Sequence, residues 1–263
     1  MFYILLIIEN ILLLKDKCGL IIGLSSDISI GWGITKICAE EGAKLFATYN
    51  REAKKKRAEP LANQVGAELL RCNAQSDEEI EALFRTLKEK GVKLDFIVHS
   101  VAFANKDNLH NPFNFTTREG FAEAMDISAY SLIKFVHEAL PILNDNASVL
   151  SLSYYGAEKV VPNYKVMGVC KAALEAIIRE LAVDLGPRGI RINGISAGAI
   201  KTLASSGISD FRSLFNGSIE RSPLKRPCTI EEVGKSAAYL LSDYSSAVTG
   251  EIHHVDCGFN ITA

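Results

Sequence analysis

Short apolar segments alternate with amphipathic segments along most of the chain, and this alternation limits the fold more than any other feature. The strand-like runs lie at residues 18–24, 44–49, 68–72, 94–99, 148–153, 190–195 and 251–255. The segments with helical spacing lie at residues 31–41, 52–65, 76–90, 118–140, 165–185 and 230–242. Because helical segments separate the strands, we expect the strands to run parallel and to be covered on both faces. The sequence predicts an α/β fold with a single doubly wound parallel sheet.

The length and charge of the chain favour one cytoplasmic domain. With 263 residues, 48% of them hydrophobic, residues 1–263 can form one large domain with a substantial core. The formal net charge of -2 gives no general attraction to nucleic acid or to an anionic membrane. The six cysteines are scattered and form no Cys-x-x-Cys pair. We therefore expect no disulfide framework and no metal site, as in a reducing cytoplasm.

The N-terminal run MFYILLIIENILLL is almost wholly apolar. Glu9 and Asn10 interrupt it and no small-residue cleavage site follows, which disfavours a signal peptide. The run is also too short to span a bilayer. We expect residues 1–12 to be an atypical apolar extension, either an extra strand-like segment or the product of a start codon assigned too early.

A glycine-rich turn joins the first strand to the first helix. Residues 23–33 read Gly-Leu-Ser-Ser-Asp-Ile-Ser-Ile-Gly-Trp-Gly. Glycines allow the backbone to approach a pyrophosphate closely, and the following helix N-terminus offers unpaired N–H groups and a positive dipole end. The spacing is not the plain Gly-x-Gly-x-x-Gly pattern, so an ordinary strand-to-helix turn is the alternative interpretation.

The ends of the next strands should meet the rest of a dinucleotide. An acidic residue after the second strand would bind the ribose 2′-hydroxyl of NAD, whereas a basic residue can hold the 2′-phosphate of NADP. This chain has neutral Asn50 followed by Arg51, which leaves the preference open. Cys72 and Asn73, after the third strand, would flank the adenine. The residues expected near the middle of the cofactor, after the fourth strand, are Ser100, Val101 and Ala102.

Tyr164 and Lys171 are seven residues apart. If the segment between them is helical, both side chains lie on one face to within roughly 20° and about 10 Å apart along the axis. A phenol and an ammonium on one face can act as a proton donor and its electrostatic support. The alternative is a surface tyrosine at a helix start and a solvated helix lysine. Their joint occurrence in this context favours the catalytic interpretation.

Several motifs together resemble the short-chain dehydrogenase/reductase superfamily. Gly23, Ser29 and Gly33 fit its Gly-x5-Ser-x3-Gly dinucleotide motif, and residues 195–204, Ile-Ser-Ala-Gly-Ala-Ile-Lys-Thr-Leu-Ala, also fit. Residues 151–158, Ser-Leu-Ser-Tyr-Tyr-Gly-Ala-Glu, and 162–168, Pro-Asn-Tyr-Lys-Val-Met-Gly, resemble the narrower group of NADH-dependent enoyl-[acyl-carrier-protein] reductases. The resemblance runs from about residue 13 to the C-terminus. It implies a Rossmann-type sheet and reduction of trans-2-enoyl thioesters in fatty-acid elongation, with NADH favoured over NADPH.

The resemblance also implies roles for individual residues. Tyr164 would hydrogen-bond the thioester carbonyl, Lys171 would bind the nicotinamide ribose hydroxyls, and Tyr154 would line the acyl pocket as a further candidate for catalysis. Motifs and strand ends together give these expected cofactor contacts: Gly23, Ser29, Ile30, Asn50, Cys72, Asn73, Ser100, Val101, Ala102, Lys171, Ile200 and Thr202. The expected substrate contacts are Ala104, Tyr154, Tyr164, Met167 and Ala204.

The resemblance further implies a larger assembly and a mobile element. Residues from about 200 to 226 would form a mobile substrate-binding loop and helix. The family implies an enoyl-acyl carrier protein as the substrate, a homotetramer, and binding of triclosan-like inhibitors. Three positions differ from many relatives: Asn73 replaces aspartate, Ala102 replaces glycine, and Cys257 replaces the first glycine of a Val-Asp-Gly-Gly run. The first change would slightly weaken adenine recognition, and none removes a chemical group from the reacting centre.

The seven-residue spacing fits reduction of a conjugated double bond. In carbonyl-reducing members of the superfamily the tyrosine precedes the lysine by four residues, where this chain has Met167, which cannot donate a proton. In a 2-enoyl thioester the hydride goes to C3 while negative charge develops on the C1 oxygen, so a donor placed one turn earlier would follow the oxygen. Two sources of the proton that C2 receives remain open: Tyr164, and a water chain supported by Lys171.

Two other functions remain as alternatives. A carbonyl or ketoacyl reductase of the same superfamily is disfavoured by Met167. A dinucleotide-binding sensor without chemistry is disfavoured by the retention of both Tyr164 and Lys171.

Positive charge gathers in the segment before the last helix. Two acidic residues, Asp210 and Glu220, stand against the basic residues Lys201, Arg212, Arg221, Lys225 and Arg226. We hypothesise that part of this charge docks an acidic acyl carrier protein, since opposite charges steer encounter. Ordinary surface charge is an equally good explanation.

Overall fold

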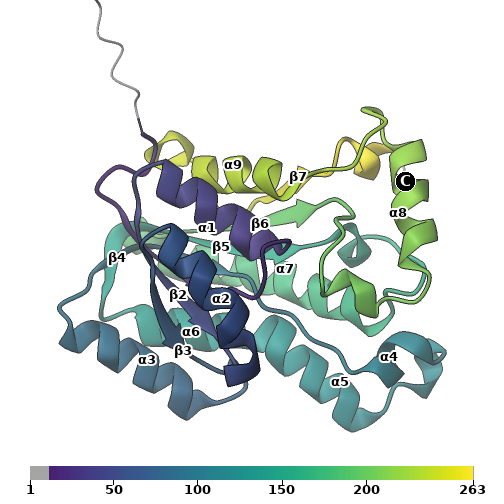
Figure 1. The fold of residues 1–263 in the computed structure, drawn as a ribbon, viewed down its shortest axis with the longest axis horizontal. Helices are drawn as coiled ribbons and strands as arrows, with labels where there is room; N and C mark the ends of the chain where they lie inside the picture. The colour runs from purple at the N-terminus through teal and green to yellow at the C-terminus, as the bar shows by residue number, and fades with distance from the viewer. Residues whose placement is uncertain (1–11, 263) are drawn as a thin grey trace, which may run out of the picture.

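The computed structural model describes residues 12–262 and contains a seven-stranded sheet in the order β3-β2-β1-β4-β5-β6-β7 (Figure 1). Every neighbouring pair of strands is parallel. The strands are β1 (Cys18–Ile22), β2 (Lys44–Tyr49), β3 (Glu68–Arg71), β4 (Leu94–His99), β5 (Leu143–Ser153), β6 (Arg191–Ala197) and β7 (Ile252–Val255). The order changes direction between β1 and β4, and open α/β sheets bind ligands beyond the carboxyl ends of the strands at such a point. The predicted doubly wound parallel sheet is confirmed.

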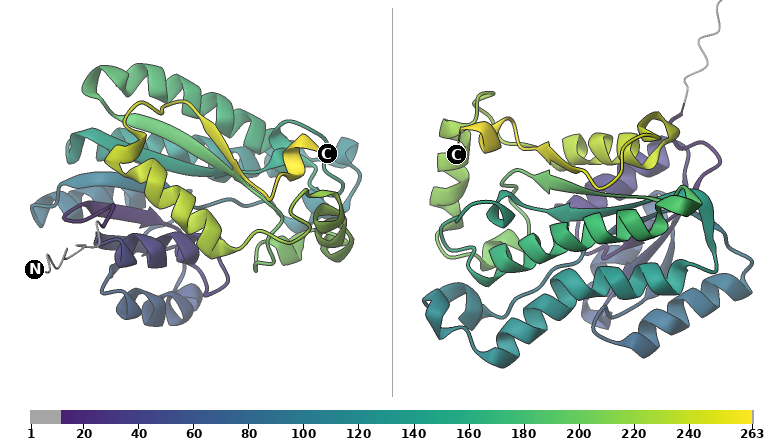
Figure 2. Two further views of the ribbon diagram at one scale, coloured as in Figure 1. Left: turned by 90° about the horizontal axis from the view of Figure 1, so that it is seen from above. Right: turned by 180° about the vertical axis from the view of Figure 1, so that it is seen from behind.

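Helices cover both faces of the sheet, as the two views in Figure 2 show. The helices of one face are α1 (Ile30–Glu40), α2 (Glu52–Gln64) and α9 (Ile230–Leu241). The helices of the other face are α3 (Asp77–Glu89), α6 (Ser131–Ala139), α7 (Val166–Leu185) and, leading into α6, α5 (Arg118–Met125). Two further helices, α4 (Lys106–His110) and α8 (Phe211–Arg221), lie beyond the carboxyl ends of the strands (Figure 1).

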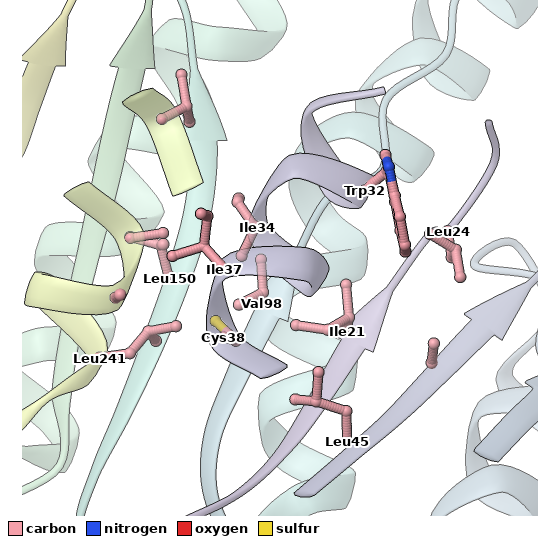
Figure 3. Packing of buried hydrophobic residues seen from close by; sticks show 14 of the residues in the cluster. Ile21, Leu24, Trp32, Ile34, Ile37, Cys38, Leu45, Val98, Leu150 and Leu241 are labelled. Carbon is pink, nitrogen blue, oxygen red and sulfur yellow. The ribbon is translucent and has the colours of Figure 1, made fainter. Parts of the chain in front are cut away.

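The helix α1 packs against the sheet and, along its side, against α9. Its residues Ile34 and Ile37 belong to one buried cluster with Val98 of β4 and Leu150 of β5 (Figure 3). A Cβ on Gly33 would lie 2.3 Å from the carbonyl oxygen of Ile230, so the glycine lets the two helices approach backbone to backbone. The last glycine of the dinucleotide motif therefore serves helix packing, which holds the start of α1 at the switch point.

Two predicted helices differ from the structure. The segment 118–140 is not one helix, because a π-helical segment, Asp126–Tyr130, separates α5 from α6. Apolar periodicity does not reveal such a segment, since the chain is helical on both sides of it, and π-segments are frequent at functional sites. The predicted helix 165–185 begins at Val166, so Tyr164 lies before it.

The start of α3 is capped by half of a capping box. Ser76 Oγ accepts the N–H of Glu79 at 3.2 Å. The Glu79 carboxylate does not return to Ser76 and instead accepts the N–H of Asn73 at 2.9 Å. A complete capping box, made by Thr229 and Glu232, begins α9.

The predicted apolar extension, residues 1–12, lies almost entirely outside the described residues. Between residues 12 and 262, no helix is long and apolar enough to cross a bilayer. Over the same span, no three His, Cys, Asp or Glu side chains are grouped so that they could hold a metal ion.

Candidate active site

The turn after β1 is closed tightly against the end of β4. Gly23 has a φ of 101°, and a Cβ there would lie 2.5 Å from the carbonyl oxygen of Ser100 and 2.7 Å from Val101 Cγ1. A Cβ on Gly31 would lie 2.9 Å from Ser100 Oγ. Only glycine fits the first place, because of its positive φ and its contact with backbone, and a larger residue at Gly31 would displace the Ser100 hydroxyl. Three predicted cofactor residues, Gly23, Ser100 and Val101, therefore meet at the switch point of the sheet.

Two serines differ in how they use their hydroxyl groups before α1. Ser29 Oγ accepts the N–H of Trp32 at 3.2 Å and donates to the carbonyl of Ser26 at 2.7 Å, so it caps the helix whose first residue is Ile30. Ser26 Oγ is buried and has no hydrogen-bond partner within residues 12–262. An unpaired buried hydroxyl beside a helix N-terminus is suited to a phosphate oxygen. Ser29 thus shapes the turn, while Ser26, which the sequence did not single out, keeps a hydroxyl that can donate to a ligand.

The predicted adenosine residues lie at the ends of β2 and β3. Asn50 Oδ1 is buried and has no partner among the described residues, so it is a spare acceptor. The Cys72 side chain is 3% exposed and packs in the core, where burial raises the pKa of its thiol to about 12. The Cys72 side chain lies in the core, so its backbone is the part that could flank an adenine. Asn73 Oδ1 accepts the N–H of Gln75 at 3.3 Å.

Tyr154 and Tyr164 contact each other edge to face, with ring centroids 4.8 Å apart and planes at 67°. A Cβ on Gly156 would lie only 2.4 Å from the ring of Tyr164, so the glycine gives this ring its place. Burial raises the pKa of Tyr154 to about 12, and the nearby Asp256 adds to the effect. Burial also raises the pKa of Tyr164, with smaller contributions from Tyr154 and Cys170. Both phenols therefore remain protonated donors at neutral pH.

Lys171 is an ammonium group held inside the protein. Its side chain lies on α7 and is 5% exposed, and its Nζ donates to the carbonyl of Leu152 at 2.6 Å. Burial lowers its pKa to about 8, against the raising effects of Cys170 and Glu175. Leu152 is two residues before Tyr154, so the lysine and the tyrosine pair are anchored at the same end of β5.

The predicted two-turn helical relation between Tyr164 and Lys171 is wrong. Lys171 is on α7, but the residues around Tyr164 form a turn, with a φ of 64° at Asn163 and 46° at Lys165. The Tyr164 side chain nevertheless packs against a buried cluster that contains Met167. A turn that folds onto the first turn of α7, and not helical periodicity, holds the phenol at this end of the helix.

Comparison with known proteins decides the family. Residues 23–260 match the family described as Enoyl-(Acyl carrier protein) reductase. The chain belongs to this family. It is 53% identical over 249 residues to enoyl-[acyl-carrier-protein] reductase [NADH] 1 of Rhizobium meliloti (strain 1021), which covers 94% of this chain and 92% of the relative.

Two solved structures of enoyl reductases have the same fold. The protein from Anaplasma phagocytophilum, in complex with NAD, is 43% identical with a TM-score of 0.90, over 96% of this chain and 95% of that one. The protein from Bacillus cereus, with NADP+ and indole naphthyridinone, is 42% identical with a TM-score of 0.93, over 95% of this chain and 99% of that one.

The remaining residues expected in the enoyl reductase site fall into three groups. Met167 is buried in the cluster against which Tyr164 packs, and Ala104 packs against the same cluster. Ile200 packs against the cluster that surrounds α1, and Thr202 exchanges hydrogen bonds with Ser205, the Thr202 N–H donating at 2.8 Å and its Oγ1 accepting at 3.0 Å. The other two residues, Ala102 and Ala204, are exposed and belong to none of the buried clusters.

One departure from the enoyl reductase pattern has a structural consequence. Cys257 has a φ of 60°, a conformation that glycine adopts without strain and other residues adopt rarely. The preceding Asp256 carboxylate accepts the N–H groups of Gly258 at 2.9 Å and of Asn260 at 2.8 Å. The turn is thus held by the aspartate although the residue with the positive φ is not glycine.

Polar residues beside the site form hydrogen bonds with distant parts of the chain. His99 is fully buried between Ser131 and Ser151, with ring-nitrogen to hydroxyl distances of 2.8 Å and 3.1 Å. Burial, and secondarily Lys171, lower its pKa to about 3, so His99 is neutral and structural. Ser128, in the π-helical segment, accepts the N–H of Phe103 at 2.9 Å. These hydrogen bonds join parts of the chain that are far apart in sequence, and no local sequence pattern predicts them.

Proposed function

We propose that this chain reduces the 2,3 double bond of trans-2-enoyl-[acyl-carrier-protein] thioesters with NADH, the last reductive step of a fatty-acid elongation cycle. The observation that carries the proposal is the partly buried phenol of Tyr164, packed edge to face on Tyr154 at the end of β5 where Lys171 is anchored. The relative from Rhizobium meliloti, named as an NADH-dependent reductase at 53% identity, supports the substrate and the cofactor.

The two tyrosines and the lysine have separate roles in this reaction. Reduction at C3 places negative charge on the thioester oxygen, and a neutral phenol in a buried site stabilises such charge strongly. Tyr164 is that donor, because its raised pKa keeps its proton in place. Tyr154 lines the acyl pocket beside it. Lys171 binds the nicotinamide ribose hydroxyls and places a positive charge near the developing negative charge.

The residues at the switch point fit a dinucleotide. The backbone at Gly23 is open to close approach, Ser26 Oγ is a spare donor for a phosphate oxygen, and Asn50 Oδ1 is a spare acceptor for a ribose hydroxyl. A 2′-phosphate offers mainly acceptor oxygens, so it would gain nothing from Asn50 Oδ1 and would depend on the exposed Arg51. This favours NADH over NADPH. When bound, NADH supplies the hydride that C3 receives.

We expect the purified protein to oxidise NADH when it is mixed with crotonyl or longer 2-enoyl thioesters, and to use NADPH less well. The measurement is the absorbance of the reduced nicotinamide, with titrations of both cofactors and a 3-ketoacyl thioester as the comparison substrate. Turnover of the 3-ketoacyl substrate alone would indicate a ketoacyl reductase. Binding of NADH without turnover of either substrate would indicate a sensor.

Further properties belong to the same proposal. The protein is cytoplasmic, assembles as a homotetramer and binds triclosan-like inhibitors; the structure of the Bacillus cereus relative with indole naphthyridinone supports inhibitor binding. Residues 200–226, which include α8, form the substrate-binding loop and helix and move during the reaction cycle.

The positive charge of this segment is smaller than its sequence implies. Arg226 forms an ion pair with Glu232 at 2.6 Å, so it is neutralised locally. Lys201 lies 4.4 Å from the ring centroid of Phe215 and Arg212 is exposed on α8. We propose that Lys201 and Arg212 contribute most of the docking charge for an acidic carrier protein.

Reversal of both charges, Lys201→Glu with Arg212→Glu, is expected to raise KM for a carrier-linked enoyl substrate and to leave KM for the coenzyme A thioester unchanged. The carrier protein would meet negative charge where it met positive charge, and the effect should diminish at high salt. The reversal Lys56→Glu with Arg57→Glu, on exposed residues of α2, is the matched control. Equal losses on both substrates would contradict a docking role and indicate damage to α8.

A further inference from the structure

Asn163 and Lys165, the two neighbours of Tyr164, both have unusual backbone conformations. Asn163 has a φ of 64°, and Lys165 has a φ of 46° with a ψ of -121°. Asparagine enters the left-handed region more readily than most residues, but the conformation of Lys165 is one that glycine ordinarily supplies. Lys165 also immediately precedes α7, makes no side-chain cap, and brings positive charge to the positive end of the helix dipole. Local preferences therefore do not explain a lysine at this position.

The side chains of these two residues bind two different segments near the site. Lys165 Nζ donates to the carbonyls of His110 at 2.8 Å and of its successor at 2.7 Å, at the end of α4. Asn163 Nδ2 donates to the carbonyl of Ser209 at 2.8 Å, just before α8. The two segments are also joined to each other, because the His110 ring Nε2 lies 3.3 Å from the carbonyl of Gly207. The Tyr164 turn, the end of α4 and residues 205–210 thus form a closed set of hydrogen bonds.

We propose that Asn163 and Lys165 are positioning residues that make the placement of the Tyr164 phenol depend on residues 205–210 and on the end of α4. The inference rests on the proposed function, in which Tyr164 donates to the substrate oxygen. Strained backbone persists where surrounding contacts hold it, and here the contacts come from the segment expected to bind substrate. The tyrosine therefore reaches its working position when residues 205–210 are seated, which links substrate binding to proton donation.

Three variants of lysine residues separate this role from a general contribution to folding. Lys165→Met removes the donor and keeps the length of the side chain, so the strained backbone stays. Lys165→Gly removes the donor and also relieves the backbone. Lys159→Met is the matched control, since Lys159 is an exposed lysine in the same connection between β5 and α7. For each variant, kcat and KM with crotonyl-coenzyme A, the affinity for NADH and the melting temperature are measured.

We expect both Lys165 variants to lower kcat/KM for the thioester by about tenfold or more, because a misplacement of about 1 Å can cost ~10²-fold in rate. The affinity of both variants for NADH is expected to equal that of the wild type, since Lys165 does not lie at the switch point. Lys165→Gly is expected to melt at or above the wild-type temperature despite its lost activity, because glycine adopts this conformation without strain. Lys159→Met is expected to match the wild type in every measurement.

Asn163→Gly tests the bond to residues 205–210 alone. Glycine tolerates the positive φ, so the variant removes the bond to Ser209 without adding strain. We expect KM for the thioester to rise more than kcat falls, because residues 205–210 are released while the Lys165 bonds still hold the turn.

The inference is overturned if Lys165→Met keeps wild-type kcat/KM. It is also overturned if Lys165→Gly regains both the melting temperature and the activity that Lys165→Met loses. The second result would show that Lys165 acts only through stability. A wild-type protein that binds NADH but does not reduce the thioester would refute the proposed function and this inference with it. An active wild type with unaffected Lys165 variants would refute this inference alone.

Discussion

The Tyr164→Phe variant is expected to lose on the order of 10²-fold or more in kcat for enoyl thioesters, with unchanged affinity for NADH. Phenylalanine keeps the ring that packs on Tyr154 at 4.8 Å, so the fold of the turn should persist. Only the hydroxyl is removed, and with it the donor to the oxygen on which charge develops. Because burial raises the pKa of Tyr164, the wild-type rate should show no ionisation of this phenol near neutral pH.

The measurement is steady-state kinetics with crotonyl-coenzyme A together with the melting temperature. Tyr244→Phe is the control for loss of a phenol, since Tyr244 is 66% exposed in the connection between α9 and β7. Full activity of Tyr164→Phe would remove the proton-donor role from this residue. A loss that is matched by weaker NADH binding would instead assign the tyrosine to cofactor binding.

The sheet could be predicted because its inner strands are almost wholly buried on both faces. Strands of that kind are nearly continuous apolar runs, and the runs between turn residues gave their order along the chain. The start of β5 was predicted too late, at residue 148 instead of Leu143. The polar residues 144–146, of which 145 and 146 are exposed, hide the first part of this strand, and its pairing with β4 shifts register between Leu94 and Phe96.

The cofactor end of the site could be predicted because it depends on backbone requirements that glycine reveals. Gly23 must have a positive φ and must leave space for Ser100, and both conditions are visible as a motif. The unpaired hydroxyl of Ser26 could not be predicted, since it is defined by the absence of a partner in three dimensions. The hydrogen bonding between Ser128 and Phe103 could not be predicted either, because it joins residues 25 positions apart.

The position of Tyr164 shows where spacing arguments end. The expected helical face placed the phenol beside α7, and the side chain does lie there, but a turn with two positive φ values puts it there. A pattern of two residues cannot distinguish a helix from a turn that folds back onto a helix. The bonds of Asn163 and Lys165 to distant carbonyls, which hold the turn, leave no trace in local propensity.

The Lys171→Met variant is expected to lose on the order of 10²-fold in kcat/KM and to be more stable than the wild type at neutral pH. The pKa of Lys171 is about 8 in the folded protein against 10.5 in the unfolded chain, so the buried charged form is destabilised by about 3 kcal/mol. Below pH 8 both states carry the proton and the wild type bears this full cost. Methionine fills similar space without a charge, so the cost disappears.

The stability difference should depend on pH in a direction that identifies its origin. Between pH 8 and 10.5 the folded wild type has lost the Lys171 proton while the unfolded chain still holds it, so the wild-type free energy of unfolding should rise relative to Lys171→Met as pH increases. Denaturant unfolding of both proteins from pH 7 to 10.5 measures this, and subtraction cancels the other groups. Over the same rise above pH 8, wild-type kcat/KM should fall as the ammonium is lost. A stability difference that stays constant with pH would show that the charge of Lys171 does not destabilise the fold. A packing effect would not follow the titration of Lys171.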